Sequence, residues 1–119
     1  MKKYIAIILV ICMALALCAC GNKTEAPAEA KIKIGMVTDV GGVNDKSFNQ
    51  TTYEACKEFC EANKLEFTYF KPAGDSDAER VAMVDKAVDE GYNVIVIPGY
   101  AFAGTVVTAE NEYPDATFI

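Results

Sequence analysis

The chain has 119 residues, with 11 basic and 17 acidic side chains, a net charge of −6, and no histidine or tryptophan. An acidic chain without a basic stripe is poorly suited to nucleic acid. The lack of histidine excludes histidine-based acid–base catalysis and histidine-ligated metal sites in this sequence. We therefore expect no nucleic-acid partner, no metal site and no cofactor.

Residues 1–20 are predicted to be an export signal. Two lysines precede an apolar run, residues 5–17, which is shorter than the about 20 residues that a membrane-spanning helix needs. The following LCAC at residues 17–20 resembles a bacterial lipobox. The resemblance implies that Cys20 carries a diacylglycerol, usually with a further acyl chain, and anchors the protein on the outer face of the cell membrane. The alternative is a plain transmembrane anchor.

The rest of the chain divides into a tether and a folded part. Residues 21–30, GNKTEAPAEA, are polar and small, with too little apolar content to fold, and are predicted to be a flexible tether. Residues 31–119 are predicted to form an α/β unit. Because the chain ends inside an apolar strand without a cap or turn, we expect an incomplete amino-terminal lobe of a longer protein. The alternative is a small domain with an unprotected edge strand.

Strands and helices alternate along residues 31–119. Strands are predicted at residues 31–38, 66–70, 93–97 and 116–119, and helices at residues 47–63, 76–90 and 102–112. Ser76 and Glu79 have the spacing of a capping box, and Gly91 is placed to end that helix. The third strand, NVIVI, contains a continuous run of β-branched apolar residues, which predicts burial on both faces. The alternation predicts a flavodoxin-like parallel sheet with right-handed crossovers.

The first helix carries an apolar stripe. Phe48, Thr52, Cys56, Phe59 and Cys60 fall at helical spacing, which predicts that they face the core. Cys56 and Cys60 are expected to be buried and unbonded, because the Cβ vectors of such neighbours on a helix run alongside each other.

The loop at residues 39–46 is the richest candidate binding element. Loops that leave the carboxyl ends of parallel strands line the ligand crevice of an open α/β sheet. Asp39 and Asp45 can accept hydrogen bonds from hydroxyl or amine groups, and Asn44 can both donate and accept. Phe48, at the start of the next helix, offers a flat surface for stacking.

Each of these residues also has a purely structural interpretation. Asp45 or Ser47 can cap the helix, and Asp39 can hydrogen-bond its own turn. Phe48 lies on the apolar helix face and can pack in the core. The double glycine of this loop lacks the G-x-G-x-x-G spacing of a dinucleotide site.

Two further loops leave the same edge. After the third strand, Tyr100 and Phe102 lie beside Gly99, and the two rings can hold a planar ligand between them. Alternatively, Phe102 packs beneath the helix that it opens. After the second strand, Asp75 and Asp77 are expected to serve the start of the following helix, where negative charge is favourable.

With these residues in view, the chain resembles the amino-terminal part of the basic membrane protein family. The resemblance rests on the lipobox, on KIGMVTDVGGVNDKSFNQ at residues 33–50, on IPGYAF at residues 97–102 and on YPDATFI at residues 113–119. It implies a two-lobed type I periplasmic binding protein, of which this chain forms part of the first lobe. The sequence departs from the family pattern at residues 103–105, AGT.

The resemblance also implies a ligand and a site. Family members bind purine nucleosides between the lobes, with the base stacked on aromatic rings and the ribose hydroxyls held by carboxylates. The residues that it places in or near the site are Asp39, Asn44, Asp45, Phe48, Gly99, Tyr100 and Phe102.

The expected function is therefore that of a lipid-anchored extracytoplasmic receptor, which delivers a nucleoside to the permease of an ABC importer. No covalent chemistry is needed. Other small ligands remain open, namely a sugar, a flavin or a signalling metabolite, as does a sensor that signals to a kinase. An enzyme that uses Asp39 and Asp45 as a hydrolase pair is disfavoured, because no nucleophile, metal cluster or histidine accompanies them.

Overall fold

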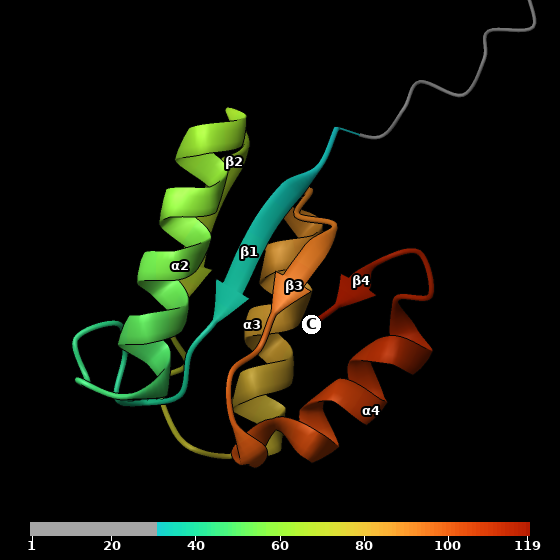
Figure 1. Ribbon diagram of the computed structural model, residues 1–119. Coiled ribbons are helices and arrows are strands. Elements are labelled where there is room, and N and C mark those ends of the chain that lie inside the picture. The colour runs from blue at the N-terminus through green and yellow to red at the C-terminus, as the bar shows by residue number, and fades with distance from the viewer. Residues whose placement is uncertain (1–30) are drawn as a thin grey trace, which may run out of the picture. The chain divides into compact units, whose positions relative to one another are not determined.

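The computed structural model describes residues 31–119, shown in colour in Figure 1. Within it, Lys31–Ile119 form one compact unit. The predicted export signal, the lipid-bearing Cys20 and the tether lie outside the described residues and stay predictions. Over residues 31–119, no helix combines the length and the apolar character that crossing a bilayer requires.

Four parallel strands form one sheet. They are β1 (Lys33–Val37), β2 (Glu66–Phe70), β3 (Val94–Val96) and β4 (Thr117–Phe118), in the order β2-β1-β3-β4. Gly35 of β1 is opposite Thr68 of β2 and Ile95 of β3. This confirms the predicted parallel sheet. The strand order is the flavodoxin-like one, in which β2 is added on one side of β1 and the later strands on the other.

Helices cover both faces of the sheet. α2 (Phe48–Asn63) lies in front of it in Figure 1, and α3 (Asp77–Asp89) lies behind. The 3₁₀ turn η1 (Tyr100–Phe102) leads into α4 (Ala103–Glu112), which packs on α3. The change of face follows from right-handed crossovers, because β1 to β2 and β2 to β3 run in opposite directions across the sheet.

The main core lies between the sheet and α3 with α4. Phe70 of β2 packs edge to face on Tyr92, with ring centroids 5.5 Å apart. Val84, Ile95 and Phe102 are almost entirely excluded from solvent in the same cluster. Full burial of such a side chain stabilises the fold by about 1.5–3 kcal/mol, so this layer holds the sheet to α3.

The prediction of which α2 residues face the core holds for Cys60 and in part for Thr52 and Cys56, and is wrong for Phe48 and Phe59. Asn49 and Cys60 are 1% exposed, whereas Phe48 and Phe59 are 65% and 55% exposed. The stripe that meets the sheet also includes Tyr53, whose ring lies 5.6 Å from that of Phe67 on β2. Residues 49, 53, 56 and 60 share one helix face, and positions 48 and 59 lie beside it.

Of the two cysteines of α2, Cys60 is buried and Cys56 is half-buried, and neither forms a disulfide. Their unbonded state confirms the prediction, and burial is complete for Cys60 alone. Burial raises the pKa of both thiols above the ordinary value, with the neighbouring Cys60 adding to the effect at Cys56. Both thiols therefore stay protonated at neutral pH.

The predicted burial of β3 on both faces is also wrong. Ile95 is buried, but Val94 and Val96 are half-buried. α2 covers β2 and β1, and among residues 31–119 no helix covers β3 on that face. Val94 and Val96 instead line an apolar cleft of about 280 Å³ with Phe59 and Ile119.

The predicted ends of α3 are confirmed. The Ser76 hydroxyl accepts a hydrogen bond from the Glu79 N–H at 3.2 Å, and the Glu79 carboxylate accepts one from the Ser76 N–H at 3.1 Å. Gly91 follows the helix with φ +85°, a conformation that glycine adopts without strain. The Ser76 hydrogen bonds lower the pKa of Glu79.

We predict that Ser76→Ala lowers the free energy of unfolding by about 1 kcal/mol, because it removes this cap. Ser47→Ala is the matched control, since Ser47 precedes α2 without a side-chain cap hydrogen bond. Urea unfolding followed by circular dichroism measures both. Equal losses in the two variants would contradict the assignment of the cap.

Candidate ligand-binding site at the carboxyl edge of the sheet

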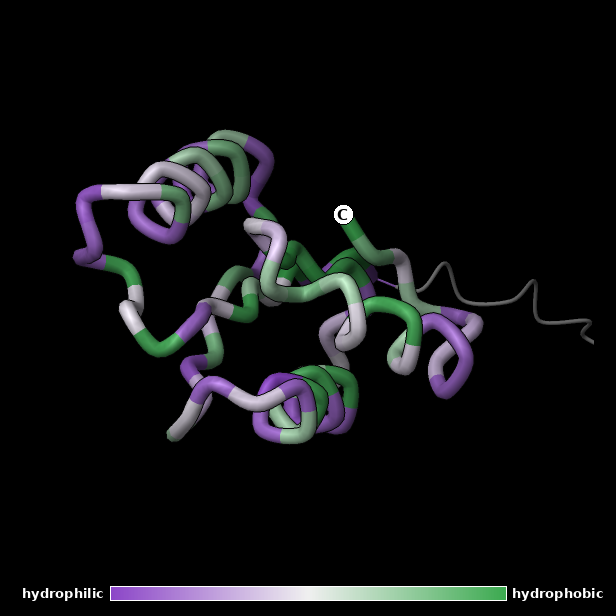
Figure 2. The backbone as a smooth tube through the Cα atoms, turned by 90° about the horizontal axis from the view of Figure 1, so that it is seen from below, coloured by the Kyte–Doolittle hydropathy of each residue, from purple (hydrophilic) through white to green (hydrophobic). Residues whose placement is uncertain are grey.

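Three loops meet at the carboxyl edge of the sheet, as predicted. Parallel strands send every following loop to the same edge, which is the lower edge in Figure 1 and faces the viewer in Figure 2. The loop after β1 touches the loop after β2, because a Cβ added to Gly42 would lie 3.3 Å from the Lys71 side chain. η1 follows β3 at this edge.

Asn49 organises the first loop. Its side chain is 1% exposed, and its amide nitrogen donates to Asp39 Oδ1 at 2.7 Å and to Asp45 Oδ2 at 2.9 Å. The Asp39 N–H donates to Asn49 Oδ1 at 3.4 Å. One buried amide thus joins the start and the end of the loop. Asn49 is not among the site residues predicted from the sequence; the signal available was an asparagine in the first turn of a helix that follows two loop aspartates.

Asp45 caps α2. Its carboxylate accepts hydrogen bonds from the backbone N–H groups of Ser47, Asn49 and Gln50, at 2.8, 3.3 and 3.0 Å. Desolvation opposes ionisation, but these bonds and the Asn49 amide outweigh it, so the pKa of Asp45 lies below its ordinary value. Of the two capping candidates, Asp45 is confirmed, whereas Ser47 makes no side-chain cap bond.

Asp39 holds its own turn through one carboxylate oxygen. Its Oδ1 accepts from the Gly41 N–H at 2.7 Å and from Asn49, whereas Oδ2 accepts neither bond. A Cβ at Gly41 would lie 3.0 Å from Asp39 Oδ1, a tight contact that glycine avoids. The half-buried carboxylate is therefore oriented by Oδ1 and offers Oδ2 as an acceptor.

The remaining predicted site residues divide into exposed and buried. Asn44 is exposed, and the rings of Phe48 and Tyr100 are 65% and 96% exposed at this edge. Gly99 has φ +106°, which disfavours any other residue. Phe102 is 1% exposed and belongs to the core, the alternative that the sequence left open.

Residues 31–119 contain no group of three or more histidine, cysteine, aspartate or glutamate side chains placed to hold a metal ion. The carboxylates of Asp39 and Asp45 are instead joined through Asn49. The arrangement suits recognition through hydrogen bonds and stacking.

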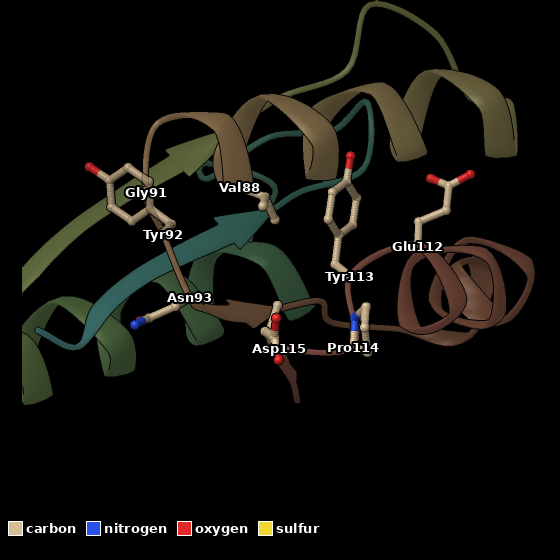
Figure 3. Close-up of a pocket in the computed structure, with 9 residues that line it drawn as sticks. Val88, Gly91, Tyr92, Asn93, Glu112, Tyr113, Pro114 and Asp115 are labelled. Carbon is tan, nitrogen blue, oxygen red and sulfur yellow. The ribbon is translucent and has the colours of Figure 1, made fainter. Parts of the chain in front are cut away.

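A separate cavity of about 280 Å³ lies at the opposite edge of the sheet (Figure 3). Val88, Tyr92 and Tyr113 line it, with the turn that precedes β4. The Tyr113 hydroxyl donates to Asp85 at 3.0 Å, which raises the pKa of Tyr113. None of the predicted site residues lines this cavity.

An open parallel sheet with polar loops and exposed rings at its carboxyl edge defines a ligand-binding α/β domain. Residues 32–119 match the Bmp family, described as "ABC transporter substrate-binding protein PnrA-like", and the chain belongs to that family. The match confirms the family predicted from the sequence. The family consists of substrate-binding proteins of transporters, not of enzymes.

Two curated relatives illustrate the similarity. The "CD4+ T-cell-stimulating antigen" of Listeria monocytogenes is 31% identical over 90 residues, which are 71% of this chain and 25% of the relative. The "ABC transporter nucleoside-binding protein BmpA" of Lactococcus lactis is 28% identical over 92 residues, 74% of this chain and 26% of the relative. The chain thus spans about a quarter of the length of these relatives.

Solved structures agree with the fold. The crystal structure of an ABC transporter solute-binding protein from Aeropyrum pernix K1 superposes with a TM-score of 0.63 and 25% identity, over 73% of this chain and 23% of that one. The chain therefore has the fold of part of a solute-binding protein, as the resemblance implied.

We predict that Asn49→Ala lowers the free energy of unfolding by about 1–3 kcal/mol, because it leaves buried hydrogen-bonding partners unpaired. Asn63→Ala is the matched control on the same helix, since the Asn63 amide donates at an exposed position to the Phe59 carbonyl. Urea unfolding compares the two. A loss no larger for Asn49 than for Asn63 would refute the organising role of Asn49.

We also predict that Asp45 stabilises the fold in a pH-dependent way. Its pKa is lowered in the folded state, so its contribution is fully present above the ordinary value of about 3.9 and is lost as the pH falls through the folded pKa. Asp45→Asn should therefore be less stable than the wild type at pH 7, and the difference should shrink below about pH 4.

Urea midpoints measured from neutral to acidic pH test this expectation. Asp115→Asn removes one negative charge from an exposed turn outside the network and controls for net charge. A difference between Asp45→Asn and the wild type that stays constant into the acid range would exclude the linkage.

Proposed function

We propose that this chain is part of a lipid-anchored extracytoplasmic receptor of an ABC importer, which binds purine nucleosides between two lobes and passes them to a permease. The observation that carries the ligand proposal is a fixed carboxylate with a free oxygen in the loop after β1, followed by an exposed aromatic ring in the first turn of α2. These are Asp39 and Phe48.

The chemistry of a nucleoside fits these groups. Ribose hydroxyls are donors that a carboxylate oxygen such as Asp39 Oδ2 can accept. A purine is a flat ring that stacks on an aromatic side chain, and Phe48 and Tyr100 are both exposed at this edge. The amide of Asn44 can donate to and accept from a purine edge or a hydroxyl.

Asp45 is assigned a mainly supporting part. Its oxygens already accept four hydrogen bonds, from the backbone N–H groups of Ser47, Asn49 and Gln50 and from the Asn49 side chain. Asp45 therefore orients the loop, and it contacts a ligand only if it shares one of these bonds. Gly99 lets the chain turn before Tyr100, and Phe102 anchors that turn in the core.

Two further observations support the receptor proposal. The Lactococcus relative is named a nucleoside-binding protein. The LCAC motif at residues 17–20 suits lipid attachment at Cys20, which would keep the receptor beside its permease at the outer face of the membrane. We propose that the second wall of the cleft comes from a second lobe that closes on the ligand.

Calorimetric titration of the full-length gene product with nucleosides, sugars and flavins tests the ligand class, and chromatography of the recovered ligand tests for turnover. We expect saturable binding of purine nucleosides and their recovery unchanged. Tighter binding of a sugar or flavin would replace the nucleoside proposal, and conversion of the ligand would overturn the receptor function.

We predict that Phe48→Ala weakens nucleoside binding about tenfold or more, since stacking of a base on an aromatic side chain contributes about 1–3 kcal/mol. Phe59→Ala is the matched control, because Phe59 is exposed to a similar extent on the same helix but far from its first turn. The same calorimetry measures both affinities. Unchanged affinity in Phe48→Ala and in Asp39→Ala would remove this edge from the site.

A further inference from the structure

Arg80 is an unusual residue in this chain. It is the only arginine of the 119 residues, and it lies in the first turns of α3 with 6% of its surface exposed. Burial of a charge is costly unless the charge is paired. Its guanidinium forms ion pairs with Asp75 and, at 3.4 Å, with Asp77. Its Nε has no hydrogen-bond partner within residues 31–119.

Arg80 also contacts the turn after β3. Its Nη1 donates to the Ala101 carbonyl at 3.1 Å, and its guanidinium carbon lies 5.3 Å from the centre of the Phe102 ring. The hydrogen bond from the Phe102 N–H to the Gly99 carbonyl within η1 is long at 3.5 Å, so the turn depends on contacts with other elements, namely the core around Phe102 and Arg80. Arg80 therefore holds the turn at two adjacent residues.

Asp77 extends this contact to α4. Its Oδ1 accepts from the Thr105 hydroxyl at 3.0 Å. A Cβ added to Gly104 would lie 2.5 Å from Asp77 Oδ2, so any other residue at that position would displace the Asp77 carboxylate. Gly104 and Thr105 thus join α4 to the Arg80 cluster.

Tyr100 immediately precedes the two residues that Arg80 contacts, Ala101 and Phe102. It is 96% exposed, so no packing within the described part of the chain holds its ring, and its place at the binding edge depends on the backbone of η1. We propose that Arg80 is a positioning residue, which fixes the Ala101 carbonyl and the Phe102 ring and so presents Tyr100 to the ligand. This inference rests on the nucleoside-receptor function proposed above.

Replacement of Arg80 can change the position of η1 without unfolding the protein. Removal of one partner of a buried ion pair destabilises a protein when it leaves a buried charge unpaired. The side chains of Asp75 and Asp77 are 66% and 59% exposed, so their carboxylates stay hydrated when methionine replaces Arg80. Arg80→Met is therefore expected to fold, whereas the carbonyl of Ala101 loses its donor. Arg80→Lys keeps the charge, but a single ammonium group lacks the fork that reaches the Asp75 carboxylate and the Ala101 carbonyl together.

Hydrogen exchange of the ligand-free, full-length gene product tests the anchor. We expect Arg80→Met to speed amide exchange about tenfold in the peptide that contains residues 99–103, with little change in the strands of the core. Lys86→Met, which removes another cation from α3, is the matched control and should leave that peptide unchanged. Unaltered exchange in Arg80→Met would overturn the proposal whatever the ligand is.

Calorimetry with a purine nucleoside tests the functional consequence. We expect Arg80→Met to weaken binding about three- to thirtyfold, Arg80→Lys to restore little of it, and Lys86→Met to bind as the wild type does. In a Tyr100→Ala background, Arg80→Met should cause no further loss, because its effect passes through Tyr100. A merely structural role would give additive losses.

The outcomes distinguish this inference from the proposed function. Wild-type binding that is lost in Phe48→Ala but kept in Arg80→Met would overturn the positioning role and retain the receptor. Additive losses for Arg80→Met and Tyr100→Ala would also overturn it. A wild type that binds no nucleoside would overturn the proposed function and the presentation of Tyr100 to that ligand, and hydrogen exchange would still decide whether Arg80 anchors η1.

Discussion

The site depends on the parallel pairing of β1 with β2 and β3. Parallel strands need crossovers, so each strand delivers its following loop to the same edge of the sheet. β1 is the central element, because it pairs with both neighbours, and its loop touches the one after β2 at Gly42 and Lys71. Without this pairing, loops that are far apart in the sequence would not share one edge.

Two polar networks convert that edge into a defined surface. Asn49 joins Asp39 to Asp45 in the first loop, and Arg80 joins the loops after β2 and β3. Each uses a side chain that is more than nine-tenths buried to fix groups that remain accessible. A preorganised surface of this kind avoids paying for order at the moment of binding.

Much of the architecture was predictable because it follows from local chemistry. The Ser76–Glu79 capping box and Gly91 set the ends of α3, and strand–helix alternation gave the parallel sheet. The orientation of α2 was not predictable, because two apolar stripes one residue apart compete on this helix. Packing of Tyr53 against β2 selects the stripe that excludes Phe48.

The sequence by itself determined the alternation of elements, the loops that share the carboxyl edge of the sheet and the family to which the chain belongs. Only the tertiary structure decided the part that each side chain plays. It placed Phe102 in the core, left Tyr100 exposed, committed Asp45 to the cap of α2 and left Asp39 an open oxygen. The reason is physical: local propensities act within a few residues, whereas burial and hydrogen-bond partners depend on contacts between distant segments.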